Sequence, residues 1–294
     1  MNTQPGILAP VPKHGRFLLF NLQAQSADLS QVQEILQELM DGEACVIGFG
    51  PSLVQAFGSE ISGLRCFPAI AGDGFDVPST QHALWVWLRG EDPGELLHRS
   101  LDFEYSLAMD FQLVEVLDCF MYDTGRDLTG YIDGTENPAG GEAVAAAIVQ
   151  GQGEGLDGSS FVAVQQWKHD FESFDAMSDQ EQDNTIGRRK SDNEELDDAP
   201  LSAHVKRTAQ ESFTPEAFMV RRSMPWAEGN EAGLNFVAFG KSLDAFEVMM
   251  ERMAGLEDGI ADALFRFTRP MSGGYYWCPP MKHGKLDLSC LQHK

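Results

Sequence analysis

Residues 16–23 read RFLLFNLQ, an apolar run of strand length that predicts a buried β-strand near the start of the chain. Residues 29–40 then place apolar side chains at helical spacing, which predicts an amphipathic helix that ends near Gly42. Two more apolar runs follow, CVIGF at 45–49 and HALWVWL at 82–88, and the connections between the runs are rich in Gly, Pro and Ser. Both runs predict strands.

A second helix is expected to begin at Pro93, because proline suits the first turn of a helix, and to continue to about Leu107. Residues 111–122 return to a strand pattern. The first half of the chain therefore has the order strand, helix, strand, strand, helix, strand. This order is that of a ferredoxin-like unit.

The second half of the chain repeats this order. Expected strands lie at 161–167, 218–224, 234–239 and 275–278, and expected helices lie at 169–185 and 242–254, with Ser242 as the cap of the last helix. A loop-rich connection at about 123–160 joins the two halves. We therefore predict an α+β protein with two ferredoxin-like domains in tandem, residues 1–125 and residues 126–294. Each domain is expected to be an antiparallel sheet with helices on one face.

The 294 residues are 43% hydrophobic and 22% charged, which is the composition of a folded globular protein. The net charge of −24 argues against partners such as nucleic acids or anionic membrane surfaces. The five cysteines are widely spaced, which favours a reducing compartment over a disulfide framework or a metal knuckle. No export signal and no apolar run of membrane-spanning length is visible, so we expect a cytoplasmic protein.

Several common catalytic motifs are missing from the sequence. It has no Walker A loop, no dinucleotide-binding glycine fingerprint and no nucleophile elbow, and no two of its seven histidines have the spacing of a helical zinc pair. These absences are compatible with a site that uses a single histidine, such as an axial haem ligand supported by a carboxylate.

Two polar features are candidates for a site. Asp133 lies in the loop at 128–138, where Gly134 would let a flat ligand approach the backbone, although the pattern is also typical of an aspartate that caps a turn. Arg221 and Arg222 are neighbours on an expected strand, so one of them points inward and needs an anion, unless the pair covers a sheet edge. The acidic run at 170–198 is typical of a solvated helix and loop.

The segment GYIDGTENPAG at 130–140 resembles the Gly-x-x-Asp-Gly signature of the dye-decolourising peroxidases. The similarity continues in VQQWKHD at 164–170, TIGRRK at 185–190, SAHVKR at 202–207, RRSMPW at 221–226 and RFTRPMSGGYYWCPP at 266–280. Such an ordered series is far more specific than one short motif. The resemblance implies two ferredoxin-like domains, with haem b held mainly by the C-terminal one.

The resemblance also implies roles for particular residues. His204 would be the proximal iron ligand, Asp262 its acidic partner, Asp133 the distal acid/base, Arg221 the distal arginine and Arg188 the partner of a haem propionate. Further cofactor contacts are expected from Ile132, Gly134, Thr135, Glu136, Phe239 and Leu264.

Ser223 stands where some family members have an asparagine, which leaves open whether Asp133 or Arg221 contributes more to catalysis. We expect Arg221 to contribute more, because water can shuttle a proton but cannot supply a fixed positive charge.

The function that the resemblance implies is a haem b peroxidase that reduces hydrogen peroxide and oxidises dyes and other small aromatic reductants through a ferryl intermediate. One alternative is a protein that carries haem or removes its iron, with incidental peroxidase activity, and another is a haem-free binding module. Asp133 and Arg221 favour the enzyme, because a carrier needs no acid–base pair. Similar proteins are commonly homodimers or tetramers. The C-terminal tail of members that enter a nanocompartment is not visible in this sequence.

Six large aromatic residues lie in or near the matching motifs: Tyr131, Trp167, Trp226, Tyr275, Tyr276 and Trp277. At the surface they could relay electrons from dyes too bulky to reach an enclosed haem. Large aromatic side chains pack mostly inside proteins, however, so the interpretation as core residues is favoured.

Overall fold

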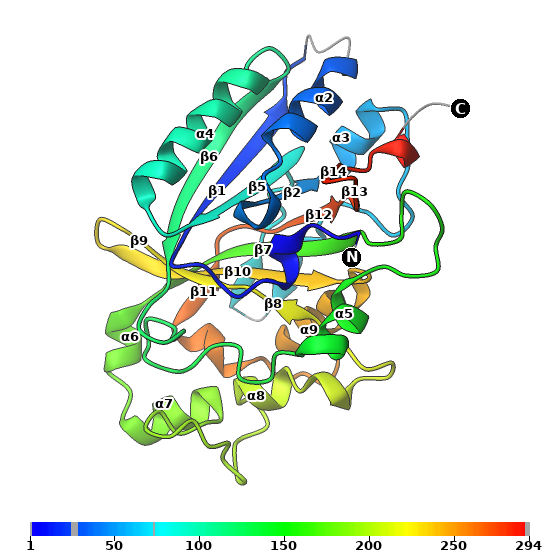
Figure 1. Cartoon of the computed structure of the whole chain (residues 1–294). Coiled ribbons are helices and arrows are strands. Elements are labelled where there is room, and N and C mark those ends of the chain that lie inside the picture. Colours follow the sequence, from blue (N-terminus) through cyan, green and yellow to red (C-terminus); the bar gives the residue numbers. More distant parts are fainter. Residues whose placement is uncertain (1, 25–28, 73, 292–294) are drawn as a thin grey trace.

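The computed structural model describes residues 2–24, 29–72 and 74–291 (Figure 1). In the N-terminal half it confirms the predicted order of elements. These are β1 (His14–Leu22), α2 (Ser30–Leu39), β2 (Cys45–Phe49), β5 (Leu84–Gly90), α4 (Pro93–Leu107) and β6 (Phe111–Phe120). Shorter elements are α1 (Pro5–Leu8), η1 (Gly42–Ala44), α3 (Pro51–Ala56), β3 (Ile70–Gly72) and β4 (Phe75–Val77).

Strand β5 shows how an alternating sequence builds two cores. Leu84, Val86 and Leu88 belong to the core that includes the apolar face of α4, whereas Trp85 and Trp87 belong to a second core on the other face. Successive side chains of a strand point to opposite faces, so a strand buried on both sides is apolar throughout. Helix α4 packs on β1 and β5, as Figure 1 shows.

The C-terminal half supplies the remaining strands and most of the short helices. The strands are β7 (Ser160–His169), β8 (Val220–Arg221), β9 (Met224–Glu228), β10 (Glu231–Gly240), β11 (Thr268–Pro270), β12 (Gly274–Cys278), β13 (Met281–Lys282) and β14 (Lys285–Leu286). The helices are α5 (Gly140–Ala147), α6 (Phe171–Asp175), α7 (Asp179–Ile186), α8 (His204–Arg207) and α9 (Asp244–Met253), with the 3₁₀ turns η2 (Gln210–Ser212), η3 (Ala263–Arg266) and η4 (Ser289–Leu291).

Strands of both halves form one antiparallel sheet in the order β11-β7-β12-β2-β5-β1-β6-β9-β10-β8, and β7 also pairs with β10. The sheet therefore closes into a ring, and the expectation that each half has a separate sheet is wrong. The halves meet where Trp277 pairs with Phe49 and where Cys119 pairs with Trp226. Closure pairs strand edges that two separate sheets would leave exposed.

Aromatic side chains fill the inside of this ring. The rings of Phe17 and Trp87 stack with their centroids 5.6 Å apart, and those of Trp85 and Tyr276 stack at 6.0 Å. Phe239 of β10 lies within 6.5 Å of both tryptophans. The ring interior is thus a packed core, and it leaves the outer face of the C-terminal strands to the helices below them in Figure 1.

Three expected elements differ from the structure. The helix expected at 169–185 is wrong, because β7 continues to His169 and two short helices follow, α6 capped by the Asp170 side chain and α7 by Ser178. Each cap satisfies backbone N–H groups and so starts a new helix.

The single strand expected at 218–224 is also wrong, since β8 and β9 form two strands on either side of residues 222–223. The last helix begins at Asp244 rather than at Ser242, although the Ser242 hydroxyl accepts a hydrogen bond from the Asp244 N–H at 3.3 Å. The connection at 123–160 contains the helix α5.

All six aromatic residues of the motifs are buried, with at most 6% of their surface exposed. The interpretation as core residues is confirmed, so none of the six offers a surface site for dyes. Among the described residues, no helix combines the length and apolar character needed to cross a membrane.

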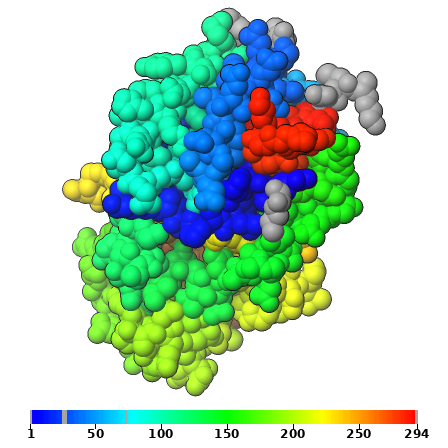
Figure 2. Space-filling view, in the orientation of Figure 1, coloured from blue at the N-terminus to red at the C-terminus, as the bar shows by residue number. Residues whose placement is uncertain are grey.

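The segment before β1 is fastened into the ring by one glutamine. Figure 2 shows this segment, in dark blue, across the junction of the two halves. Gln4 is fully buried, and its Nε2 donates to the backbone oxygens of Ile47 at 2.9 Å and Pro279 at 3.1 Å. The Ile47 N–H donates back to Gln4 Oε1 at 2.7 Å. Gln4 therefore links β2 of the first half to the residues that follow β12 of the second.

We expect Gln4→Ala to lower the free energy of unfolding by roughly 2–4 kcal/mol, because it leaves buried backbone groups without partners. Urea unfolding monitored by tryptophan fluorescence measures the change. Gln55→Ala, at an exposed position of α3, is the matched control and should have a much smaller effect. Equal stability of Gln4→Ala and the control would show that Gln4 does not fasten the segment.

Candidate active site

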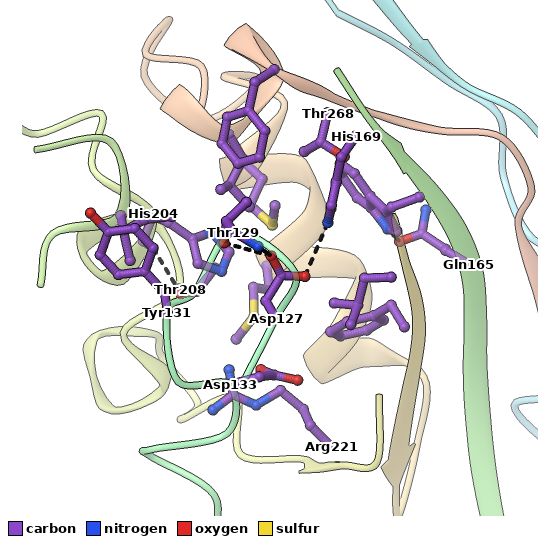
Figure 3. Close-up of a pocket in the computed structure, with 18 of the residues that line it drawn as sticks. Asp127, Thr129, Tyr131, Asp133, Gln165, His169, His204, Thr208, Arg221 and Thr268 are labelled. Atoms are coloured by element: carbon purple, nitrogen blue, oxygen red, sulfur yellow. Dashed lines mark hydrogen bonds and ion pairs between the residues drawn. The ribbon is translucent and has the colours of Figure 1, made fainter. Parts of the chain in front are cut away.

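A pocket of about 960 Å3, partly open to solvent, lies between the outer face of β7 and β10 and the helices α8 and α9 (Figure 3). Its apolar and aromatic lining comes from Tyr131, Ile132, Trp167, Ile186, Leu234, Phe236, Phe246, Met249, Met250, Met253, Leu264 and Phe267. Its polar lining includes Asp127, Asp133, His169, His204 and Arg221. The pocket therefore combines an apolar body with a few converging charged groups, which is typical of a cofactor or substrate site.

His204 is the first residue of α8 and lines the pocket. Its Nδ1 lies 2.8 Å from Oδ2 of Asp262, whose side chain is completely buried. The other carboxylate oxygen, Oδ1, accepts a hydrogen bond from the Leu264 N–H at 2.8 Å. Because Nδ1 is held by the carboxylate, Nε2 is the nitrogen available to a ligand in the pocket.

Asp133 and Arg221 lie side by side at another wall of the pocket, as Figure 3 shows. Burial raises the pKa of the Asp133 carboxyl, and the Arg221 guanidinium opposes this shift. Among the described residues, the buried Nε of Arg221 has no hydrogen-bond partner. The same wall of the pocket thus holds a carboxyl group and a guanidinium whose Nε has no partner among the described residues.

Asn137 connects the loop of Asp133 to the strand of Arg221. Its Oδ1 accepts from the Arg221 N–H and its Nδ2 donates to the Arg221 oxygen, both at 2.8 Å. Arg222 points the other way and donates to the Leu8 oxygen at 2.8 Å. Of the two neighbouring arginines, Arg221 therefore lines the pocket and Arg222 does not.

The other predicted cofactor contacts are not all at the pocket. Ile132 and Leu264 line it, and Gly134 lines a smaller neighbouring cavity of about 520 Å3. The remaining four lie outside the lining. Thr135 accepts a hydrogen bond from Asn193, Arg188 forms ion pairs with Glu136 and Glu195, and Phe239 points into the ring interior.

Strand geometry explains why Phe239 points away. On β10, Leu234 and Phe236 face the pocket, so the odd-numbered Phe239 faces the opposite side of the sheet.

Sequence reasoning missed several residues of the lining. Gln165, Trp167 and His169 occupy alternate positions of β7 and all face the pocket. Their two-residue spacing would have placed them on one face if the strand had been predicted to reach His169. Asp127 carried no signal apart from its place shortly before the Gly-x-x-Asp-Gly motif.

Comparisons with known proteins agree with this geometry. Residues 124–283 match the family model of the C-terminal part of Dyp-type peroxidases. A dye-decolorizing peroxidase of Mycolicibacterium paratuberculosis is 31% identical over 93% of this chain and 82% of its own length. The chain belongs to the dye-decolourising peroxidase family. It is therefore a haem peroxidase, as the motifs predicted.

Related structures extend the match to the whole fold. A putative Dyp-type peroxidase of Shewanella oneidensis superimposes with a TM-score of 0.89 at 26% identity, covering 98% of this chain and 97% of its own. A variant of DypB from Rhodococcus jostii RHA1, solved in complex with heme, superimposes with a TM-score of 0.85 at 25% identity, covering 94% and 95% of the two chains.

The residues of the pocket fit a haem. The lining of the pocket is mainly apolar, which suits the flat apolar body of a haem. His204 offers one ring nitrogen, and the Nε of Arg221 and the Nε2 of Gln165 are buried donors without partners among the described residues. Buried donors of this kind are expected where a polar ligand completes the hydrogen bonding.

We expect Arg221→Leu to raise the pKa of Asp133 further in the haem-free protein, because the positive charge that lowers it is lost. The ¹³C shift of the Asp133 carboxyl carbon as a function of pH measures this change. Arg189→Leu removes a guanidinium that is paired at the surface with Asp192 and Glu194 and serves as the control. An unchanged or lower pKa in Arg221→Leu would contradict the electrostatic coupling.

Proposed function

We propose that His204 is the proximal ligand of haem b in this pocket, and that Asp133 and Arg221 act together on hydrogen peroxide. The observation that supports this proposal is a single pocket with an imidazole–carboxylate pair at one wall and a carboxyl–guanidinium pair at another. The bound haem supplies the iron chemistry of peroxide reduction.

Asp133 handles the proton of the substrate. A carboxylate oxygen of Asp133 accepts the proton of one peroxide oxygen and returns it to the other oxygen, which leaves as water. This role requires the ionised carboxylate, and Arg221 favours that form by lowering the pKa of Asp133 against the effect of burial. The guanidinium also stabilises the negative charge that develops as the O–O bond breaks.

Asp262 acts on His204 through the hydrogen bond to Nδ1. A buried carboxylate makes the imidazole more electron-donating and fixes the direction of Nε2.

Arg188 is assigned to a propionate, because Ile186, two residues earlier, lines the pocket. A haem carrier has no use for the pair of Asp133 and Arg221, which disfavours the carrier alternative.

Substrate access is assigned to the neighbouring cavity of about 520 Å3, which shares Asp133 and Arg221 with the main pocket and is also lined by the exposed Met121 and Tyr122. The net charge of −24 favours neutral or cationic aromatic reductants.

We also propose a cytoplasmic location, which the five free cysteines support, and a homodimer or homotetramer.

The two halves, 1–125 and 126–294, are interpreted as ferredoxin-like units merged into one ring. The strand orders β2-β5-β1-β6 and β12-β7-β10-β9 support this interpretation.

We expect His204→Ala to lose most of its haem, since the imidazole is the only protein bond to iron in the proposed site. The ratio of Soret to protein absorbance after reconstitution with haemin measures the loss. His98→Ala, on the helix α4 of the other half, is the control and should bind haem normally. Full haem occupancy with an unchanged spectrum in His204→Ala would exclude His204 as the ligand.

We expect Asp133→Asn to slow the bimolecular reaction with hydrogen peroxide by roughly 10²–10⁴, the span for loss of a general acid/base. Arg221→Leu should slow it by roughly 10²–10³, the effect of removing one stabilising donor. Stopped-flow absorbance of the haem-loaded variants gives both rate constants. Wild-type rates in both variants would overturn the assignment of these two residues, and a fast Arg221→Leu beside a slow Asp133→Asn would leave the proton transfer as the dominant contribution.

A further inference from the structure

The pocket contains a second imidazole–carboxylate pair that the proposed reaction does not use. His169, the last residue of β7, places Nε2 3.0 Å from Oδ2 of Asp127 and Nδ1 2.8 Å from Oγ1 of Thr268 (Figure 3). The side chains of His169 and Asp127 are only 5% and 15% exposed. Burial of such a pair costs free energy unless every polar atom of the pair is hydrogen-bonded. The direction of each hydrogen bond therefore matters.

The hydrogen-bond partners of His169 indicate where the hydrogens of its ring lie. The Thr268 hydroxyl donates its one hydrogen to the Lys168 oxygen at 3.0 Å, so Oγ1 accepts from the His169 Nδ1–H. Burial opposes ionisation of Asp127, but hydrogen bonds from His169 and Thr129 hold its pKa below the usual range. An ionised Asp127 can only accept, so Nε2 also carries a hydrogen and the ring is an imidazolium.

Asp127 lies in the same loop as Asp133, where Arg126 pairs with Ile132 and forms a short hairpin. The backbone N–H of Asp127 donates to the backbone oxygen of Tyr131, and the backbone oxygen of Asp127 accepts from the Gly130 N–H, both at 2.8 Å. Its Oδ1 accepts from the N–H and the hydroxyl of Thr129. The bond to His169 therefore ties this hairpin to the end of β7, and the carboxylate of Asp127 is a negative charge close enough to raise the pKa of Asp133.

We propose that Asp127 and His169 are positioning residues for Asp133: a buried carboxylate–imidazolium pair that anchors its hairpin and keeps a negative charge beside it. The other charges near the pair face elsewhere. Asp170 caps α6 through Ser173, and Lys168 pairs with Glu231 at the surface. The rings of Phe171 and Phe267 that pack on His169 are uncharged. Asp133 itself is influenced by Arg221, Asp127 and, more weakly, His204.

The charge of His169 can be read directly in the haem-free protein. Two-bond ¹H–¹⁵N correlation at neutral pH should show both ring nitrogens of His169 protonated. In Asp127→Asn the amide can donate to Nε2 while its oxygen still accepts from Thr129, so His169 should become the neutral tautomer with hydrogen on Nδ1. A neutral His169 in the unmodified protein would overturn the proposal, and this measurement requires no variant to fold.

The effect on Asp133 is tested by the pH dependence of the peroxide reaction, and this part rests on the proposed role of Asp133. The rate falls as the pH drops through the pKa of Asp133, because the ionised form is required. Asp127→Asn also neutralises His169, but among the pair only Asp127 acts on the pKa of Asp133, so loss of its negative charge should move the acid limb of the profile to lower pH. Asp170→Asn removes an exposed carboxylate one residue from His169 and should leave the limb unmoved.

An acid limb that stays in place or moves upward in Asp127→Asn, while Asp133→Asn reacts slowly, would overturn the positioning role. A merely structural contact would lower the rate at every pH without moving the limb. Wild-type kinetics in Asp133→Asn would instead refute the proposed function of Asp133. The ion pair of Asp127 and His169 would then be tested by the ¹⁵N measurement alone.

Discussion

The pocket depends on one buried carboxylate. Asp262 has no exposed side-chain surface, and an ionised carboxylate without partners would be too costly at such a position. Its two oxygens are satisfied by His204 and by the Leu264 N–H, and its own N–H donates to Met253 at the end of α9. The three segments that form this side of the pocket are therefore held by the same residue. The orientation of the His204 ring follows from this arrangement.

A second group of contacts organises the wall that carries Asp133 and Arg221. Asn137 holds the backbone of Arg221 against the loop of Asp133, and the pair of Asp127 and His169 ties the same loop to β7. The ring of strands behind this wall is filled by stacked aromatic side chains and provides a rigid support. The reacting groups thus come from loops and strand ends, whereas their positions are fixed by the sheet.

The sequence predicted those parts of the fold that depend on local patterns. Apolar runs of strand length located most strands, and Pro93 located the start of α4, where the Asp92 carboxylate caps the helix. Ring closure was not predictable, because it rests on single pairings such as Trp277 with Phe49 between strands far apart in the chain. The helix expected at 169–185 failed because the capping side chains of Asp170 and Ser178 were overlooked.

The candidate site was likewise predicted where short sequence patterns suffice and missed where tertiary structure decides. The family resemblance pointed to His204, Asp133, Arg221 and Asp262, which the structure brings to one pocket or directly behind it. Phe239 was misplaced because the register of β10 decides which face a side chain takes. Asp127 and His169 come from segments 42 residues apart, and their contact depends on tertiary structure alone.

The most direct test of the central claim is the reduction potential of the haem iron in the wild-type protein and in Asp262→Asn. If the buried carboxylate makes His204 electron-donating, the neutral amide should raise the potential while haem stays bound. Glu257→Gln, which removes an exposed carboxylate paired with Arg252, is the control and should leave the potential unchanged. Spectroelectrochemical titration measures all three. A potential in Asp262→Asn equal to that of the wild type would contradict the account.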